Sequence, residues 1–336
     1  MEFAAKAAKF LRLASKTRAA LPTEIQVEVT NRCNLDCPMC PHTFGGLPIS
    51  DMPLSRFGRI LDQVPFATDV ILTGWGEPLY HADFLGLMDL CRARRPSARI
   101  RFTTNGYLLN EQRARQVLDH GVSRVAFSFD EVPPEGGAAA AGVEETPGHL
   151  PSKAALANAE RFCAMRRGTP CRVHYQVAIL PDNRKDILAL IEHAARADAD
   201  AVALMRLETW NRPELKRPDL ATERRIIAEA KARGEDFGVP VYCLNDHTWA
   251  MRVATHDDEI CLKTDASVYI TVDGEVTPCC NLRRLSGGNV ESSTVAEIWQ
   301  GEAFRRFFAD QRAACGSCDA LQARQFPPPA ALAAAR

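Results

Sequence analysis

The sequence lacks the features that mark membrane-spanning, secreted or nucleic-acid-binding proteins. It contains no run of about 18 apolar residues, so no transmembrane helix is predicted. Residues 1–20 carry basic side chains throughout and no uninterrupted apolar segment, which argues against a secretory signal peptide. The 41 basic and 42 acidic residues are interspersed and leave a net charge of −1, so no basic patch for nucleic acid is indicated. These absences favour a cytoplasmic protein with no nucleic-acid partner and no stable membrane insertion.

The length and the apolar content bound the architecture. A chain of 336 residues is expected to form one large or two moderate domains, and an apolar content of 46% allows a sizeable core. Within residues 1–23 we expect a helix that packs on the domain, because its apolar and basic side chains lie mostly on opposite faces. The alternatives are a helix on a membrane surface and an organelle transit peptide.

Twelve cysteines without an export signal do not indicate a disulfide scaffold. In a reducing compartment they are better interpreted as metal ligands or catalytic thiols. Seven of them fall into two spaced groups. Cys91, Cys163 and Cys171 stand singly in apolar segments and are expected to be small core residues.

The first group is a C-x3-C-x2-C run made of Cys33, Cys37 and Cys40, three residues after the strand-like segment 24–30. Three thiolates this close on a loop can hold three corners of a 4Fe–4S cube and leave one iron open to another ligand. A structural zinc site that includes His42 is the alternative.

A second motif gives the first one its context. The strand-like run 69–73 is followed by Gly74-Trp75-Gly76-Glu77-Pro78. With both motifs in this order, the chain resembles the radical S-adenosylmethionine (SAM) enzymes. In that family a C-x3-C-x2-C motif follows the first barrel strand and a G-G-E-P-like motif follows the second. The resemblance extends from about residue 24 to residue 318.

Strand-like and helix-like segments alternate from residue 24 onward, which indicates an α/β fold with a parallel sheet and right-handed crossovers. Strands are expected at 25–29, 70–72, 99–104, 122–129, 172–180 and 199–206. Helices are expected at 55–63, 82–94, 110–119, 152–167 and 183–197. The resemblance implies a partial (β/α)6 barrel, and in such folds the chemistry lies at the carboxyl ends of the strands.

Beyond the barrel, the pattern predicts a linker with a helix and then a small α+β auxiliary iron–sulfur module. Asp273-Gly274 indicates a hairpin between 267–271 and 275–277. The expected divisions are an N-terminal helix at 1–23, the barrel at 24–210, the linker at 211–260, the module at 261–320 and a disordered tail at 321–336. Residues 131–151 lack periodicity and are expected to be a disordered insertion or a substrate lid.

The second cysteine group consists of Cys261, Cys279, Cys315 and Cys318. It resembles the C-terminal auxiliary-cluster module of radical SAM enzymes, in the one-cluster form called twitch rather than the two-cluster form called SPASM. Four ligands would close a 4Fe–4S cube completely, and such a cluster transfers electrons or supports structure. The G-x4-C spacing favours Cys279 over the adjacent Cys280, and a four-cysteine zinc site is the alternative.

The resemblance also implies cofactor contacts. The amino and carboxylate groups of SAM would bind the open iron of the first cluster, and one electron would release a 5′-deoxyadenosyl radical. Glu77 would accept from the methionine ammonium, and Gly74 and Gly76 would let the backbone approach SAM. Met39 stands where this family often has an aromatic residue, so adenine contact there is expected through the backbone alone.

Residues at the carboxyl ends of later strands are further candidates, because these strand ends would face the same open end of the barrel, its mouth. Asn105, Ser128 and Asp130 are candidates for ribose and carboxylate contacts, although Asn and Asp are also common turn residues. Either Met205 or Arg206, at the end of the sixth strand, is expected to reach adenine or carboxylate.

The reaction type is the least constrained inference. Only 23 residues precede the first strand, which favours a small-molecule substrate over a ribosomal peptide. The one-cluster module resembles radical dehydrogenases, so we expect a radical SAM oxidoreductase that oxidises an alcohol in a biosynthetic pathway. Its electron donor would be of the flavodoxin or ferredoxin type. The alternatives are a redox-neutral epimerase with Cys243 as hydrogen donor, radical modification of a ribosomal peptide, and a non-enzymatic zinc protein.

Overall fold

The computed structural model describes residues 2–132, 153–210, 212–243, 260–261, 263–315 and 318. The loop expected at 131–151 lies outside these residues from 133 onward, as does the tail expected at 321–336.

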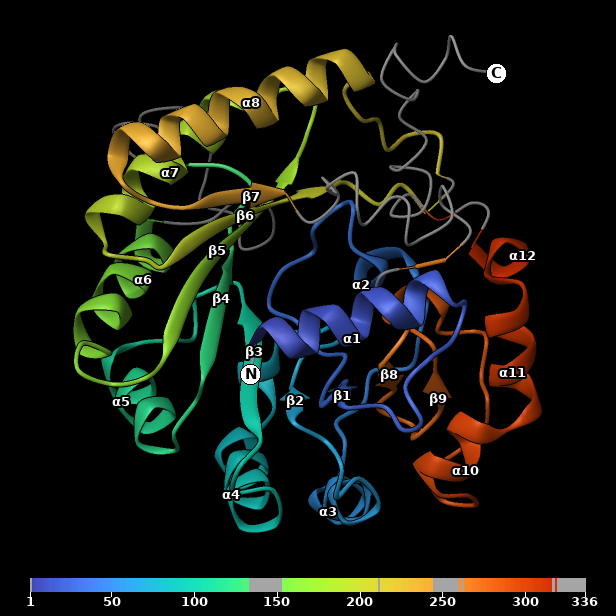
Figure 1. Ribbon diagram of the computed structural model, residues 1–336. Helices are drawn as coiled ribbons and strands as arrows, with labels where there is room; N and C mark the ends of the chain where they lie inside the picture. Colours follow the sequence, from blue (N-terminus) through green and yellow to red (C-terminus); the bar gives the residue numbers. More distant parts are fainter. Residues whose placement is uncertain are drawn as a thin grey trace, which may run out of the picture.

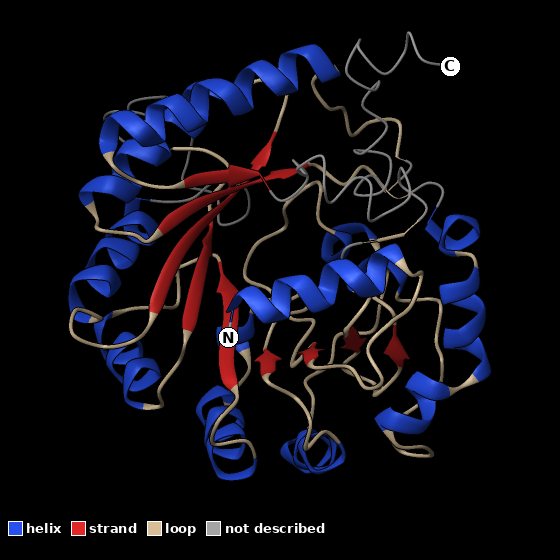
Figure 2. Ribbon diagram, in the orientation of Figure 1, coloured by secondary structure: helices blue, strands red, loops and turns tan. Residues whose placement is uncertain are grey.

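The described strands form one sheet in the order β7-β6-β5-β4-β3-β2-β1-β8-β9 (Figures 1 and 2). All neighbouring pairs are parallel except β8 and β9. The strands are β1 (Glu24–Val27), β2 (Asp69–Ile71), β3 (Arg99–Thr104), β4 (Arg124–Ser128), β5 (Arg172–Ile179), β6 (Ala201–Arg206), β7 (Val241–Cys243), β8 (Ser267–Ile270) and β9 (Val276–Thr277). The six barrel strands predicted from the sequence are therefore confirmed, and they lie in the sheet in chain order.

Helices cover the convex face of the sheet, and the other face encloses the interior of an open barrel (Figure 1). The crossover helices are α3 (Leu54–Gln63), α4 (Phe84–Arg94), α5 (Glu111–Asp119), α6 (Lys153–Met165), α7 (Arg184–Arg196) and α8 (Leu220–Phe237). The remaining elements are α1 (Glu2–Ala14), α2 (Pro41–Phe44), η1 (Pro78–Tyr80), η3 (Cys280–Leu282), α10 (Val295–Gln300), α11 (Glu302–Ala309) and α12 (Gln311–Cys315).

The alternation within β5 shows how the sequence assigns the two faces. Val173, Tyr175 and Val177 are completely buried and belong to the core beneath the helices. Their neighbours His174 and Gln176 point the other way, into the barrel, as successive strand residues must. The same core contains Cys91, Cys163 and Cys171, which are at most 2% exposed. The prediction that these three cysteines are core residues is confirmed.

The C-terminal hairpin continues the barrel sheet. β8 pairs in parallel with β1, with Glu24 opposite Ser267 and Val27 opposite Ile270, and β9 pairs with β8. Gly274 makes the turn between them with φ +89°, a conformation that favours glycine. The sequence predicted this hairpin correctly, but not that it would extend the sheet beside the first strand.

The N-terminal helix packs on this C-terminal region. Leu13 of α1 is completely buried against Ile260. On the neighbouring face of α1, the Arg12 guanidinium donates to the Asp265 carboxylate at 2.8 Å. These contacts support the expected packed helix. None of the described helices has both the length and the apolar character that crossing a bilayer requires.

A buried ion pair joins the sixth strand to its covering helix. The Arg206 side chain at the end of β6 lies 2.9 Å from the Glu223 carboxylate of α8, and the two side chains are 4% and 2% exposed. Helix α8 starts at the N-cap Asp219, whose side chain accepts from Thr222 N, and ends at Gly238 with φ +73°. The pair therefore fixes α8 against the sheet from beneath.

Removing one member of this pair should destabilise the protein strongly. Glu223→Ala leaves the Arg206 guanidinium buried without its carboxylate, so we expect the free energy of unfolding to fall by about 3–5 kcal/mol. Replacing both residues by methionine should recover most of that loss. Anaerobic urea unfolding measures both variants, and a loss below about 1 kcal/mol in Glu223→Ala would contradict the buried location.

Candidate active site

The first cysteine group lies on the loop between β1 and α2, at the carboxyl end of the first strand. Burial is the main cause that raises the pKa of Cys37 to about 12, and the neighbouring Cys40, Asp130 and Cys33 raise it further. Burial likewise raises the pKa of Cys33 to about 11, with Glu77 and Cys40 adding to the rise. Each thiol is thus close enough to affect the others electrostatically. A bound metal would displace their protons, as thiolate ligation requires.

The three thiols of this loop are the candidates for holding a cluster. Among the residues that the structure describes, no three His, Cys, Asp or Glu side chains converge closely enough to ligate one metal ion. A 4Fe–4S cube carries its thiolates on separate irons, so it needs neighbouring rather than coincident sulfur atoms. Cys33, Cys37 and Cys40 lie on one loop, and Cys40 and Cys33 raise the pKa of Cys37, so these three thiols are neighbours as such a cube requires.

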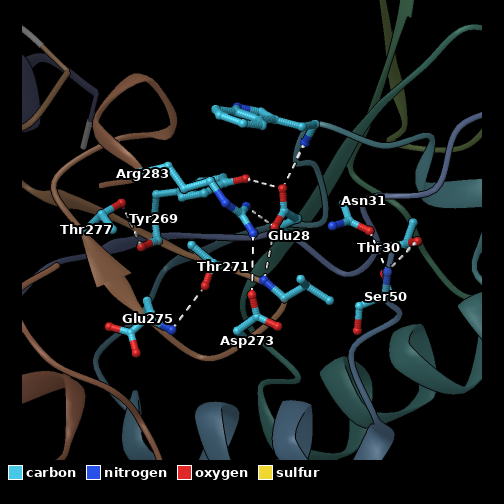
Figure 3. A network of polar contacts seen from close by, with 12 residues as sticks. Glu28, Thr30, Asn31, Ser50, Tyr269, Thr271, Asp273, Glu275, Thr277 and Arg283 are labelled. Atoms are coloured by element: carbon cyan, nitrogen blue, oxygen red, sulfur yellow. Dashed lines mark hydrogen bonds and ion pairs between the residues drawn. The ribbon is translucent and has the colours of Figure 1, made fainter. Parts of the chain in front are cut away.

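The loop itself is held by side chains just before the first cysteine. Thr30 Oγ1 donates to Asp51 Oδ1 at 2.6 Å. Asn31 accepts from Ser50 N at 2.6 Å (Figure 3). Farther along, Thr43 Oγ1 donates to Cys37 O at 2.9 Å. These bonds fix both ends of the cysteine loop over the barrel mouth.

Glu77 is a buried carboxylate beside this loop. It is 3% exposed and accepts from Thr104 Oγ1 at 2.8 Å, Asn105 N at 2.8 Å and Leu79 N at 3.2 Å. Burial raises the pKa of Glu77 to about 7, although these three hydrogen bonds oppose the rise. In the part of the chain that the structure describes, no cationic side chain forms an ion pair with it. Such a carboxylate is suited to an ammonium group that arrives with a ligand.

Asn105 connects this motif to the cysteine loop. Its Nδ2 donates to Asn34 Oδ1 at 2.9 Å, and its Oδ1 accepts from Tyr107 N at 3.1 Å. Because its backbone N–H also binds Glu77, Asn105 joins the end of β3 to both motifs. The structure therefore gives Asn105 a positioning role beside the ribose or carboxylate contact predicted for it.

Asp130 also lies beside the cysteine loop. Its Oδ1 accepts from Ala178 N at 2.9 Å, and burial raises its pKa. Its charge in turn raises the pKa of Cys37 and Cys40. Ser128 and Met205 are half-buried near the ends of β4 and β6, on the faces that point into the barrel. These three residues remain candidates for contacts to SAM.

The two motif glycines are required by the protein's own packing. A Cβ atom on Gly74 would lie 2.2 Å from Glu28 Cγ, and one on Gly76 would lie 2.4 Å from Arg32 O. Both positions exclude any side chain because β1 and the start of the cysteine loop pass directly beside them. This is a different reason from the close approach to SAM that the sequence suggested.

Two sequence-based candidates face away from the barrel mouth. Arg206 points beneath α8 to its partner Glu223, which argues against the SAM contact considered for it. Met205 is the inward-facing residue of the two and remains the candidate. Cys243 lies opposite Leu204 in the β6–β7 register and shares its core beneath α8. That location argues against Cys243 as a hydrogen donor. The residues that follow it, 244–259, lie outside the described part of the chain.

Sequence reasoning missed the polar residues on the inner face of the strands. Glu28, which follows β1, is fully buried and accepts from Tyr269, Val272, Trp75 and Arg283 (Figure 3). Deeper in the barrel, Thr103 Oγ1 donates to Gln176 Oε1 at 3.3 Å. The available signal was the alternation itself, since Gln26 and Glu28 occupy the polar positions between Ile25, Val27 and Val29.

The second cysteine group converges at the other side of the first strand. Burial, and after it the neighbouring Cys280, Cys261 and Cys315, raise the pKa of Cys279 well above its ordinary value. Cys318 N donates to Cys315 O at 2.9 Å, which places these two residues in one tight turn. The four predicted ligands therefore come from separate segments into one neighbourhood.

Comparisons with known proteins agree with this geometry. The model of the radical SAM superfamily matches residues 27–196, and that of the SPASM iron–sulfur cluster-binding domain matches residues 261–319. The tungsten-containing aldehyde ferredoxin oxidoreductase cofactor-modifying protein of Pyrococcus furiosus is 23% identical, over 84% of this chain and 82% of its own. The PqqA peptide cyclase of Streptomyces rochei is 26% identical, over 83% of this chain and 75% of its own.

Solved structures show the same fold. The crystal structure of Streptococcus suis SuiB bound to S-adenosylmethionine matches with a TM-score of 0.70 at 16% identity, over 93% of this chain and 74% of that one. The radical SAM domain binds a 4Fe–4S cluster and SAM, and the SPASM domain binds auxiliary iron–sulfur clusters. Because both cysteine groups lie within or beside these domains, iron–sulfur clusters are favoured over zinc. With the family model spanning half of its length over a parallel barrel sheet, this chain belongs to the radical SAM superfamily.

Proposed function

We propose that this radical SAM enzyme carries out a two-electron oxidation of its substrate. The first electron leaves with a hydrogen atom, and the second passes to an auxiliary cluster. The observation that carries the SAM-dependent step is Glu77, a buried carboxylate that has no cationic partner among the described residues and lies beside the cysteine loop. A ligand ammonium would complete its charge balance.

Cys33, Cys37 and Cys40 would hold the first cluster, and Glu77 would bind the amino group of SAM. When bound, this cluster and SAM supply a 5′-deoxyadenosyl radical. Asn105 keeps Glu77 and the cysteine loop in register through its bonds to Glu77 and Asn34. The chain's own part is thus to orient SAM and to keep water from the mouth.

Cys261, Cys279, Cys315 and Cys318 would hold one auxiliary cluster with all four of its positions filled. Such a cluster has no place for substrate, so it would serve as the acceptor of the second electron. A one-electron donor of the flavodoxin or ferredoxin type would reduce the first cluster for SAM cleavage.

We propose that the substrate is a small molecule and that an alcohol is the group oxidised. A cavity of about 600 Å³ opens beside Met39 of the cysteine loop. Its lining includes Glu131 after β4, Asp182 after β5 and Asp186 of α7, together with Lys216. This volume is typical of sites for compact ligands, and the few charged groups in its otherwise mostly apolar lining would bind the hydroxyl groups of such a ligand.

A peptide is the second candidate substrate. It is favoured by the similarity of this chain to a PqqA peptide cyclase over 83% of its length. Forming a cross-link in a peptide also removes two hydrogens, so both candidates use the electron acceptor in the same way.

The mass of the product tests the proposed oxidation. Candidate sugar alcohols and peptides are incubated anaerobically in heavy water with reconstituted enzyme, SAM and reductant. We expect a product two hydrogens lighter than its substrate and without solvent deuterium on carbon. A product of unchanged hydrogen count that carries one solvent deuteron would instead indicate an epimerase.

Replacing Glu77 by glutamine should weaken SAM binding. The variant loses the charge that would meet the ammonium, so we expect the dissociation constant for SAM to rise at least about tenfold. Equilibrium dialysis on reconstituted protein measures this effect. Unchanged affinity would show that Glu77 does not bind the amino group.

The same variant should change how stability depends on pH. The folded protein binds the Glu77 proton more tightly than the unfolded chain, because the pKa is raised from 4.5 to about 7. The stability linked to this proton is complete below the unfolded value and is lost as the pH rises through about 7. Without SAM, the free energy of unfolding of the parent should therefore fall by about 1 kcal/mol more between about pH 6 and pH 8 than that of Glu77→Gln. If the free energies of unfolding of the parent and of Glu77→Gln change equally with pH across this range, the raised pKa of Glu77 would be contradicted.

Iron analysis should decide between Cys279 and Cys280. The parent, with two 4Fe–4S clusters, is expected to hold about eight irons per chain. We expect about four in Cys279→Ala and no loss in the matched Cys280→Ala control, because Cys279 is the one that neighbours both Cys261 and Cys315. The reverse pattern would assign the ligand to Cys280.

A further inference from the structure

Glu28 joins segments that are far apart in the sequence. Its Oε1 accepts from the Tyr269 hydroxyl at 2.8 Å and from Trp75 N at 3.2 Å. Its Oε2 accepts from Val272 N at 3.0 Å and from the Arg283 guanidinium (Figure 3). One buried carboxylate thus binds the loop that carries Glu77, the C-terminal hairpin and the segment after η3.

The contacts to Glu28 are strong ones. Burial, followed by the nearby Glu28 charge, raises the pKa of Tyr269 well above its ordinary value, so its phenol stays protonated and donates. The Glu28 side chain is 0% exposed and that of Arg283 is 9% exposed, so solvent screens their ion pair little. Hydrogen bonds between charged groups in such surroundings are about twice as strong as those between neutral ones.

Trp75 contacts both members of the Glu28–Arg283 ion pair. The Arg283 guanidinium lies 5.3 Å from the centre of the Trp75 ring, while the Trp75 N–H is held by Glu28. On its other side, Trp75 O lies 3.9 Å from Cys40 Sγ, in the first cysteine group. Gly74 lies so close to Glu28 that a Cβ atom added to it would be 2.2 Å from Glu28 Cγ. The conformation of the Gly74–Glu77 segment therefore depends on Glu28 and Arg283.

Arg283 in turn depends on the second cysteine group. It directly follows η3 (Cys280–Leu282), and Cys279 is the N-cap residue of that short helix. The position of its guanidinium is thus set by how the segment of the auxiliary ligands folds. The chain leads from Cys279 through η3 to Arg283. From Arg283, contacts run through Glu28 and Trp75 to Cys40.

We propose that Glu28 and Arg283 are positioning residues that couple the auxiliary cluster site to the SAM site. With the auxiliary site in its native conformation, Arg283 and Glu28 hold Trp75 and, through it, the loop that presents Glu77 to SAM. This coupling rests on the proposed assignment of the two cysteine groups and of Glu77. Because coupling between two sites is reciprocal, SAM must also affect the auxiliary cluster.

The chain offers a matched control for a merely structural ion pair. Arg206 and Glu223 form a second Arg–Glu pair that is equally buried but lies beneath α8, facing away from the barrel mouth. Glu28→Gln and Glu223→Gln each remove one buried charge. Both should lower thermal stability, and only the first should change SAM binding.

The test uses anaerobically reconstituted full-length enzyme. SAM is titrated into the reduced protein, and the electron paramagnetic resonance signal of the first cluster reports binding. We expect the dissociation constant to rise about tenfold in Glu28→Gln, as for a lost charge-assisted contact, and to stay at the parent value in Glu223→Gln. In the parent, SAM should also shift the midpoint potential of the auxiliary cluster, and Glu28→Gln should abolish that shift.

Other outcomes would overturn the coupling. Parent-like SAM affinity in Glu28→Gln, or an equal loss in Glu223→Gln, would reduce Glu28 to a structural residue. If Glu28→Gln fails to fold, the Glu28→Gln/Arg283→Gln double variant removes both charges and should show the same weakened binding; parent-like binding there also contradicts the proposal. If the parent never binds SAM at its first cluster, the proposed function itself is refuted. If the parent cleaves SAM and the variants bind SAM as tightly as the parent does, only the coupling is refuted.

Discussion

The placement of β1 inside the sheet is the constraint on which the rest of the structure depends. This strand pairs in parallel with β2 on one side and with β8 on the other. Its carboxyl end leads into the cysteine loop, the end of β2 leads into the Gly74–Pro78 motif, and β8 leads into the hairpin of the second cysteine group. Parallel strands end at the same edge of a sheet, so β1 and β2 bring the first cysteine group and the SAM motif to one mouth. The pairing of β8 with β1 holds the C-terminal hairpin beside them.

Two buried carboxylates at this mouth have opposite surroundings. Glu28 is saturated by protein donors, including the Arg283 guanidinium, and serves to hold segments together. Glu77 has three neutral donors and a raised pKa, so its ionised form gains from a cation that enters with the ligand. Glu28, whose charge is balanced within the protein, therefore stabilises the site. Glu77, whose charge is not balanced by the described residues, is available to bind a cationic group of a ligand.

The sequence predicted the barrel strands and the location of the motifs because both depend on local patterns. Cys33, Cys37, Cys40 and Glu77 follow strands whose periodicity is visible without a structure. Other features depend on contacts between distant segments. Whether Arg206 or Met205 faces the mouth depends on the alternation of side chains along β6 and on the ion pair with Glu223 of α8. The packing around Gly74 depends on Glu28, which lies 46 positions earlier in the chain. The addition of β8 to β1 joins segments separated by most of the chain, and no local pattern specifies it.

The most direct test of the central claim measures 5′-deoxyadenosine, the product of reductive SAM cleavage. Reconstituted enzyme is incubated anaerobically with SAM and dithionite, beside a Cys33→Ala variant and a Cys171→Ala control from the buried core. The account predicts 5′-deoxyadenosine from the parent and from Cys171→Ala, and none from Cys33→Ala. A parent protein with its clusters loaded that never forms 5′-deoxyadenosine, even slowly, would contradict it.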